Sequence, residues 1–119
     1  MPQEIERELK EIEQSLYNVE CNYGDIARDA VRKRFAYEIA RAEAIETIEH
    51  RELEAGQKKP TVAVMEAQAD LMIRKELEES RYATAELDIA KTVLDSLQSR
   101  LSAIQTRAKM SQMEMALAR

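Results

Sequence analysis

Apolar residues recur along this chain at alternating spacings of four and three, which places them on one face of an α-helix. The longest series comprises Ala83, Leu87, Ala90, Leu94, Leu97, Leu101, Ile104 and Ala108. A shorter series near the start comprises Ile5, Leu9, Ile12, Leu16 and Val19. Each series forms a narrow seam that must be buried against another helix. The pattern therefore predicts amphipathic helices that associate with one another.

A third apolar series indicates another amphipathic helix over residues 25–55, with charged residues on its remaining sides. Its members are Val31, Phe35, Ile39, Ala42, Ile45 and Ile48. Gly24 and Asp25 supply a helix breaker and an N-cap, which would separate this helix from an N-terminal helix or arm over residues 1–23. Because Tyr23, Ile26 and Ala30 keep the phase of the preceding seam, one bent helix is the alternative.

A turn is expected at residues 56–60, because Gly56 can end a helix and Pro60 follows Gln57, Lys58 and Lys59. Thr61 can cap the next helix. No Gly or Pro follows Pro60, so we expect one long helix over residues 61–117.

Composition supports an all-α fold and a single helical domain over residues 1–119. The chain has 2 Gly, 2 Pro, 1 Phe and no Trp, which is typical of long helices and unusual for sheets. We expect a long helical hairpin with an N-terminal arm and coiled-coil-like packing. Two long helices leave much apolar surface in water, so a homo-oligomer is expected as well. The residues expected to mediate oligomerisation are Leu9, Ile12, Leu16, Leu87, Leu94, Leu97, Leu101 and Ile104.

The remaining composition argues against several classes of protein. No apolar run approaches 18 residues and the start lacks the features of a signal peptide, so we expect a soluble, cytoplasmic protein without a membrane partner. Cys21 and His50 are single residues of their kind and predict neither a disulfide nor a metal site. No nucleophile is paired with a base, and no cofactor motif occurs, so an enzyme is not expected.

Charge is distributed unevenly around a net value of −5. Residues 1–24 carry six acids and two bases, whereas residues 96–119 carry four bases and one acid. The acidic head and the basic tail could attract each other, or the tail could bind an anionic partner.

The best candidate for a phosphate-binding surface is a basic cluster in the second predicted helix. It comprises Arg28, Arg32, Lys33, Arg34 and Arg41, with Tyr37 among them. Cations that neutralise phosphates beside a ring that stacks on a base are typical of single-stranded DNA binding. Lys58 and Lys59 in the turn are further candidates. The alternative is that these residues are solvated helix charges paired with acids such as Asp29 and Glu38.

The stretch from about Pro60 to Lys109 resembles the carboxy-terminal helix of phage recombination mediator proteins of the UvsY type. The similarity is clearest over residues 83–89 and 93–105. Its shared element is a Leu-x-Ser-Arg-x-x-Ala-Ile-like run, here Leu97 to Ile104. Arg100 occupies the arginine of this run, where subunit packing and DNA contact are both open roles.

This resemblance implies a ring-like homo-oligomer that binds single-stranded DNA. Such a protein would help to load a RecA-type recombinase onto a strand covered by single-stranded-DNA-binding protein, in the host cytoplasm if a phage encodes it. Repetition of a modest basic patch around a ring would give a multivalent surface. The alternatives are a structural coiled-coil scaffold or assembly protein, and a helical adaptor that does not bind DNA.

Overall fold

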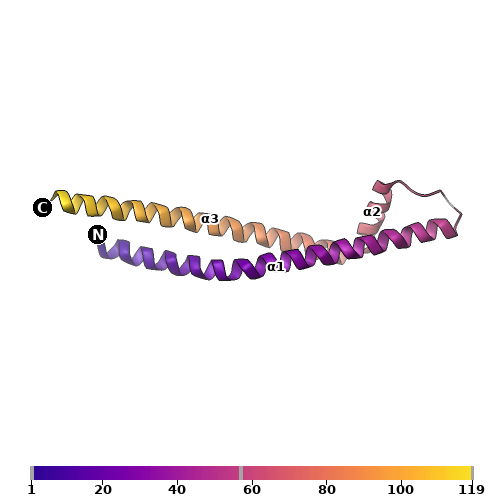
Figure 1. Ribbon diagram of the computed structural model, residues 1–119, viewed down its shortest axis with the longest axis horizontal. Coiled ribbons are helices and arrows are strands. Elements are labelled where there is room, and N and C mark those ends of the chain that lie inside the picture. The colour runs from indigo at the N-terminus through magenta and orange to yellow at the C-terminus, as the bar shows by residue number, and fades with distance from the viewer. Residues whose placement is uncertain (1, 57, 119) are drawn as a thin grey trace. The chain divides into compact units, whose positions relative to one another are not determined.

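A computed structural model describes residues 2–56 and 58–118, and all the regular structure within these ranges is helical. The helices are α1 (Pro2–Glu54), α2 (Val62–Met72) and α3 (Arg74–Leu117) (Figure 1). The all-α prediction is therefore confirmed. Met1, Arg119 and the expected turn residue Gln57 lie outside the described residues. None of the described helices is both long enough and apolar enough to cross a membrane.

Helix α1 runs without interruption through Gly24, so the expected break between residues 23 and 25 is wrong and the single-helix alternative holds. Asp25, the expected N-cap, lies inside the helix. A glycine within a helix costs only about 1 kcal/mol relative to alanine. Burial of Leu16 before Gly24 and of Ala30 after it provides apolar contacts on both sides of that weak point.

The expected turn lies between α1 and α2. Gly56 has a φ of 68°, the left-handed conformation that favours glycine after a helix, and its N–H donates to the Leu53 carbonyl at 3.2 Å. Thr61 is the N-cap of α2 as expected, because its Oγ1 accepts a hydrogen bond from the Val64 N–H at 3.3 Å.

The expected single helix over residues 61–117 is wrong, because the chain bends at Ile73 between α2 and α3. Ile73 has φ −113° and ψ 35°, outside the helical region. Its N–H still donates to the Ala69 carbonyl at 3.1 Å, and its carbonyl accepts from the Leu77 N–H at 3.0 Å. No Gly or Pro marks this bend in the sequence. We attribute it to tertiary packing, because α2 is buried against α1 through Met65 and Ala69.

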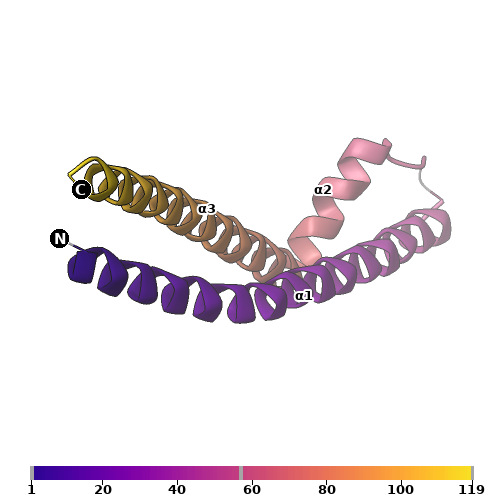
Figure 2. The same ribbon diagram turned by 60° about the vertical axis from the view of Figure 1, so that its left-hand side comes forward.

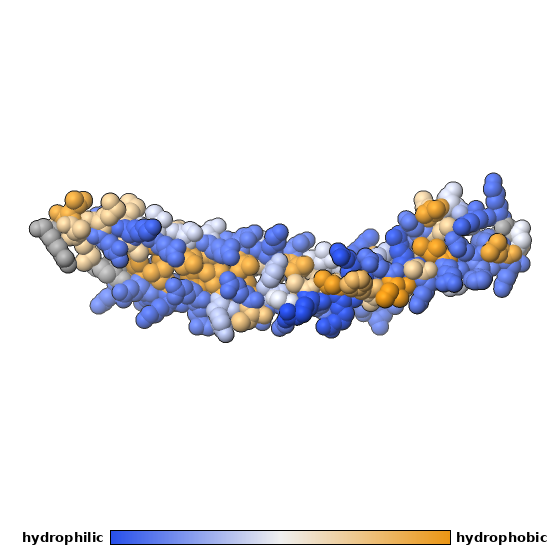
Figure 3. All heavy atoms as spheres, in the orientation of Figure 1, coloured by the Kyte–Doolittle hydropathy of each residue, from blue (hydrophilic) through white to orange (hydrophobic). Residues whose placement is uncertain are grey.

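Contacts within the chain group into two compact units, where we expected one domain. Unit 1 comprises residues 1–26 and 87–119, in which the first half of α1 lies antiparallel to the greater part of α3 (Figure 2). Its core contains Ile5, Ile12 and Leu16 from α1 and Ile104 from α3, with Leu9, Leu94, Leu97, Leu101 and Ala108 packed around them. Hydrophobic side chains form a band along this contact, bordered by hydrophilic ones (Figure 3).

The two long apolar series therefore bury each other within one chain. Leu9, Ile12, Leu16, Leu94, Leu97, Leu101 and Ile104 all belong to the core of unit 1, and Leu87 is half-buried. The chain itself supplies the second helix that each seam requires. Oligomerisation through these residues stays a prediction, and any interface between copies must also use other surfaces while unit 1 remains folded.

Unit 2 comprises residues 27–86 and has a small core between α1 and α2. Ala44 and Ile48 of α1 pack against Met65 and Ala69 of α2, with Ile45 and Ile73 at the edge. Alanines in this core allow the two helices to approach closely.

Candidate interaction surfaces

Arg41 is the centre of a polar network that joins α1 to α2 inside unit 2. Its Nη2 lies 3.3 Å from Glu66 Oε2, and its Nε lies 3.3 Å from Asp70 Oδ1. Glu66 and Asp70 are four residues apart on α2, so both carboxylates lie on the face turned toward Arg41. The Nε is buried and its N–H is not aligned for a hydrogen bond, so the contact with Asp70 is an ion pair only. The guanidinium also lies over the Tyr37 ring, with Cζ 5.9 Å from the ring centroid.

Tyr37 donates a hydrogen bond from its hydroxyl to Asp70 Oδ1 at 2.6 Å. This hydrogen bond raises the pKa of Tyr37, and burial and the negative charge of Asp70 raise it further. Tyr37 is therefore held as the neutral phenol with its proton directed at Asp70. Since Tyr37 and Arg41 have partners within unit 2, the geometry favours a structural role for both, and DNA binding by them stays a prediction.

The other members of the basic cluster lie on the preceding two turns of α1, and we call them the basic segment: Arg28, Arg32, Lys33 and Arg34. Lys33 Nζ lies 3.4 Å from Asp29 Oδ2, and Arg34 Nε lies 3.8 Å from Glu38 Oε1. These are the i,i+4 pairs of the alternative interpretation. Arg28 and Arg32 are exposed, and Arg32 forms no ion pair with any residue that the structure describes. Exposed pairs of this kind contribute little to stability, so their cations remain accessible to other anions.

The turn lysines behave differently from each other. Lys59 Nζ lies 3.2 Å from Glu49 Oε1, which links the turn back to α1, whereas Lys58 is exposed. Among the described residues, no hydrogen bond or ion pair joins either lysine to Arg32, Lys33 or Arg34.

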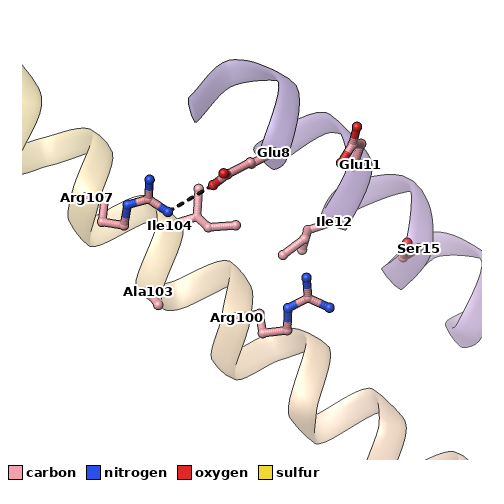
Figure 4. A pocket seen from close by; sticks show the side chains of 8 residues that line it. All are labelled: Glu8, Glu11, Ile12, Ser15, Arg100, Ala103, Ile104 and Arg107. Atoms are coloured by element: carbon pink, nitrogen blue, oxygen red, sulfur yellow. Dashed lines mark hydrogen bonds and ion pairs between the residues drawn. The ribbon is translucent and has the colours of Figure 1, made fainter. Parts of the chain in front are cut away.

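A groove in unit 1 lies between the first half of α1 and α3 (Figure 4). Its residues are Glu8, Glu11, Ile12, Ser15, Arg100, Ala103, Ile104 and Arg107. Arg107 Nη1 donates to Glu8 Oε2 at 3.0 Å, and Arg100 extends toward Ile12 from the same side of α3. Two arginines and two glutamates balance in charge, so the groove has no strong preference for an anion or a cation. Among the described residues, no cluster of three or more His, Cys, Asp or Glu side chains is arranged to hold a metal ion.

Three apolar residues that the sequence placed on the apolar side of the helix over residues 25–55 are instead exposed on α1. We call them the apolar stripe: Val31, Phe35 and Ile39. Their exposed fractions are 47%, 57% and 59%. With about 100° per residue, Val31 and Ile39 lie about 40° on either side of Phe35, whereas Ala44 and Ile48 lie about 140° to 180° away. The stripe is therefore opposite the face that packs on α2.

The spacing of the third apolar series contains the signal for this separation. Each step of four residues turns the position by about +40° and each step of three by about −60°. Val31, Phe35 and Ile39 are separated by steps of four, and Ala42, Ile45 and Ile48 continue by steps of three. The series therefore crosses from one side of the helix to the other, and its two ends cannot share one core.

Comparisons with protein-family models, with curated proteins and with solved structures find no match to this chain. The resemblance to recombination mediators of the UvsY type consequently has no support from these comparisons.

Proposed function

We propose that this chain is a non-catalytic helical binding module that associates with another protein through the apolar stripe of α1. The exposure of Val31, Phe35 and Ile39 is the observation that carries this proposal. Contiguous large apolar side chains on a protein surface favour an interaction site, because they remain in water until a partner covers them. A helix that presents anchors four residues apart suits a partner helix or a groove. This proposal corresponds to the scaffold or adaptor alternative.

Site-specific photocrosslinking tests this proposal directly. A photoreactive phenylalanine analogue at Phe35 should give crosslinked protein products in cells, because this position lies at the centre of the stripe. The same analogue at Tyr17, which is 64% exposed on α1 but outside the stripe, is the matched control. Equal yields from both positions, or no protein product from position 35, would contradict the proposal.

Single-stranded DNA binding is the second candidate, because the basic segment places four cations within two turns and Arg32 is exposed beside Phe35. Phosphate contacts and an exposed ring are the two elements of sequence-independent binding to a single strand. In this case the chain would act as the resemblance implies, as a recombination mediator with a RecA-type recombinase and single-stranded-DNA-binding protein as partners.

Fluorescence anisotropy of a labelled single-stranded oligonucleotide, at low and at physiological salt, tests the second candidate. We expect Arg32→Glu to weaken binding several-fold and to reduce its salt dependence, since one phosphate contact is lost. Arg51→Glu makes the same charge change elsewhere on α1 and should have a smaller effect. Equal loss in both variants would indicate a response to net charge alone, and no binding by the unmodified protein at low salt would exclude this candidate.

A further inference from the structure

We propose that the partner of the apolar stripe is a second copy of this chain, and that the two α1 helices pair antiparallel around a two-fold axis at Phe35. This inference rests on the proposed function and identifies the partner of the same surface. It follows from the residues along and beside the stripe, all of which belong to unit 2.

The stripe is self-complementary when two copies are antiparallel. With Phe35 of each copy at the centre, a residue before Phe35 lies level with the residue equally far after it in the second copy. Val31 therefore lies level with Ile39 of the second copy, and the two Phe35 rings meet. This contact places each large exposed side chain of the stripe against another apolar side chain, which removes it from water.

The charges beside the stripe also match in this arrangement. Arg28 lies about 20° and Glu43 about 80° to one side of Phe35 around the helix, and Glu43 of the second copy is offset from Arg28 by one residue, or about 1.5 Å along the helix. Arg34 and Glu38 lie on the other flank, with an offset of two residues, or about 3 Å. Two-fold symmetry repeats both pairs, so four ion pairs can form across the contact. The pair between Arg34 and Glu38 within one chain is long, at 3.8 Å, and can exchange for a pair between copies.

The same charges oppose a parallel arrangement. In a parallel two-fold pair in register, each flank of α1 faces the opposite flank of the second copy. Arg34 would then be offset by only two residues, or about 3 Å, from Arg32 of the second copy, and neither Glu38 nor Glu43 would be level with Arg28 or Arg34. Like charges facing each other across a helix contact are unfavourable, whereas the antiparallel arrangement brings opposite charges together.

The length of the stripe indicates how tightly two copies would bind. From residue 28 to residue 43 the contact extends about 23 Å along α1. This is one short helix pair, smaller than a standard interface of about 800 Å² per partner, so we expect dissociation in the micromolar range. Phe35 is the expected anchor, since it is the largest side chain in the stripe and lies at its centre.

Sedimentation velocity between roughly 5 and 500 μM tests the self-association. We expect a monomer–dimer equilibrium for the unmodified protein and at least tenfold weaker association for Phe35→Ser. Ile89→Ser, on α3 and 65% exposed outside the stripe, is the matched control and should associate normally. Both residues are exposed, so circular dichroism should show unchanged helicity. A monomer at all concentrations, or equal loss in the two variants, would overturn the inference.

Cys21 provides the test of orientation, because it is the single cysteine and it is exposed on α1. Spin labels on this residue in an antiparallel dimer centred on Phe35 would be separated by 28 residues of helix rise, or about 42 Å. A parallel pair in register would bring the labels to about the helix spacing of 10 Å plus the label lengths. A short distance by pulsed electron paramagnetic resonance would overturn the antiparallel arrangement.

The crosslinking experiment on position 35 separates this inference from the proposed function. Products between two copies of the chain would support both. Products with a different protein, without any product between two copies, would support the proposed function and overturn the self-association.

Discussion

The Oδ1 oxygen of Asp70 accepts a hydrogen bond from the Tyr37 hydroxyl and also forms an ion pair with Arg41. One carboxylate thus fixes two side chains of α1 against α2 and helps to set the register between these helices in unit 2. Groups that depend on a shared partner are coupled, so loss of one contact should also weaken the other.

Tyr37→Phe should remove this hydrogen bond and destabilise the protein by about 1 kcal/mol, the typical net contribution of one such bond. The folded state raises the pKa of Tyr37 above its ordinary value of about 10, so the neutral phenol is the favoured form. Its contribution to stability is complete below pH 10 and decreases as the pH rises through the folded pKa. Titration of tyrosinate absorbance should show one late phase that Tyr37→Phe eliminates.

Tyr17→Phe is the control for this titration, because Tyr17 is exposed and far from Asp70 in the sequence. It should leave the late phase in place. Loss of the late phase in this variant, or its survival in Tyr37→Phe, would contradict the assignment.

At the residue scale, ion pairs between neighbouring turns of α1 follow directly from the sequence. The pairs of Lys33 with Asp29 and of Arg34 with Glu38 were predictable, because a helix places residues four apart side by side. The pair of Arg41 with Asp70 was not, since it depends on the position of α2 and on the bend at Ile73. That bend has no local sequence marker. The role of Arg41 therefore became visible only in the structure.

At the scale of elements, the chain uses its two glycines in opposite ways. Gly24 lies inside α1, where its conformation is that of any helical residue. Gly56 lies two residues after the end of α1 and has a φ of 68°, which turns the chain away from the helix. The helices were predictable from the periodicity of their apolar series, and the turn from Gly56 and Pro60. The effect of Gly24 was not, because a glycine acts as a breaker only when the packing around it does not hold the helix together.

Alanine at these two positions should therefore shift stability in opposite directions. Gly24→Ala should stabilise the protein by about 0.5 to 1 kcal/mol, since it improves helix propensity and reduces the freedom of the unfolded chain. Gly56→Ala should destabilise it by about 1 kcal/mol, because a Cβ is unfavourable at positive φ even though no atom lies within 4 Å of its position. Urea denaturation measures both, and a destabilised Gly24→Ala would argue against a continuous α1.

At the scale of the whole molecule, the two units have separate and small cores. The core cluster of unit 1 contains four buried apolar side chains from α1 and α3, and that of unit 2 contains four from α1 and α2. Helix α2 has 11 residues, which is too short to be stable alone in water, so it depends on Met65 and Ala69 against α1.

Met65→Ala should consequently release α2 while unit 1 stays folded. Met65 is 3% exposed, and truncation of a buried methionine costs about 2 to 5 kcal/mol. Hydrogen exchange followed by mass spectrometry should show faster exchange in residues 62–72 and unchanged protection in residues 5–16 and 94–108. Met72→Ala, in the same helix but 47% exposed, should leave α2 protected. Loss of protection throughout the chain would instead show that the units unfold together.

The contact between Glu8 and Arg107 joins residues 99 positions apart in the chain, and this separation has a consequence for synthesis. Ribosomes add about 5 to 20 residues per second, so residues 94–108 are synthesised about 5 to 20 seconds after residues 5–16. All residues of unit 2, which ends at residue 86, are synthesised before residues 94–108. During this interval the apolar face at residues 5–16 is exposed to chaperones, and neighbouring nascent chains on one messenger RNA can pair through it before unit 1 folds within each chain.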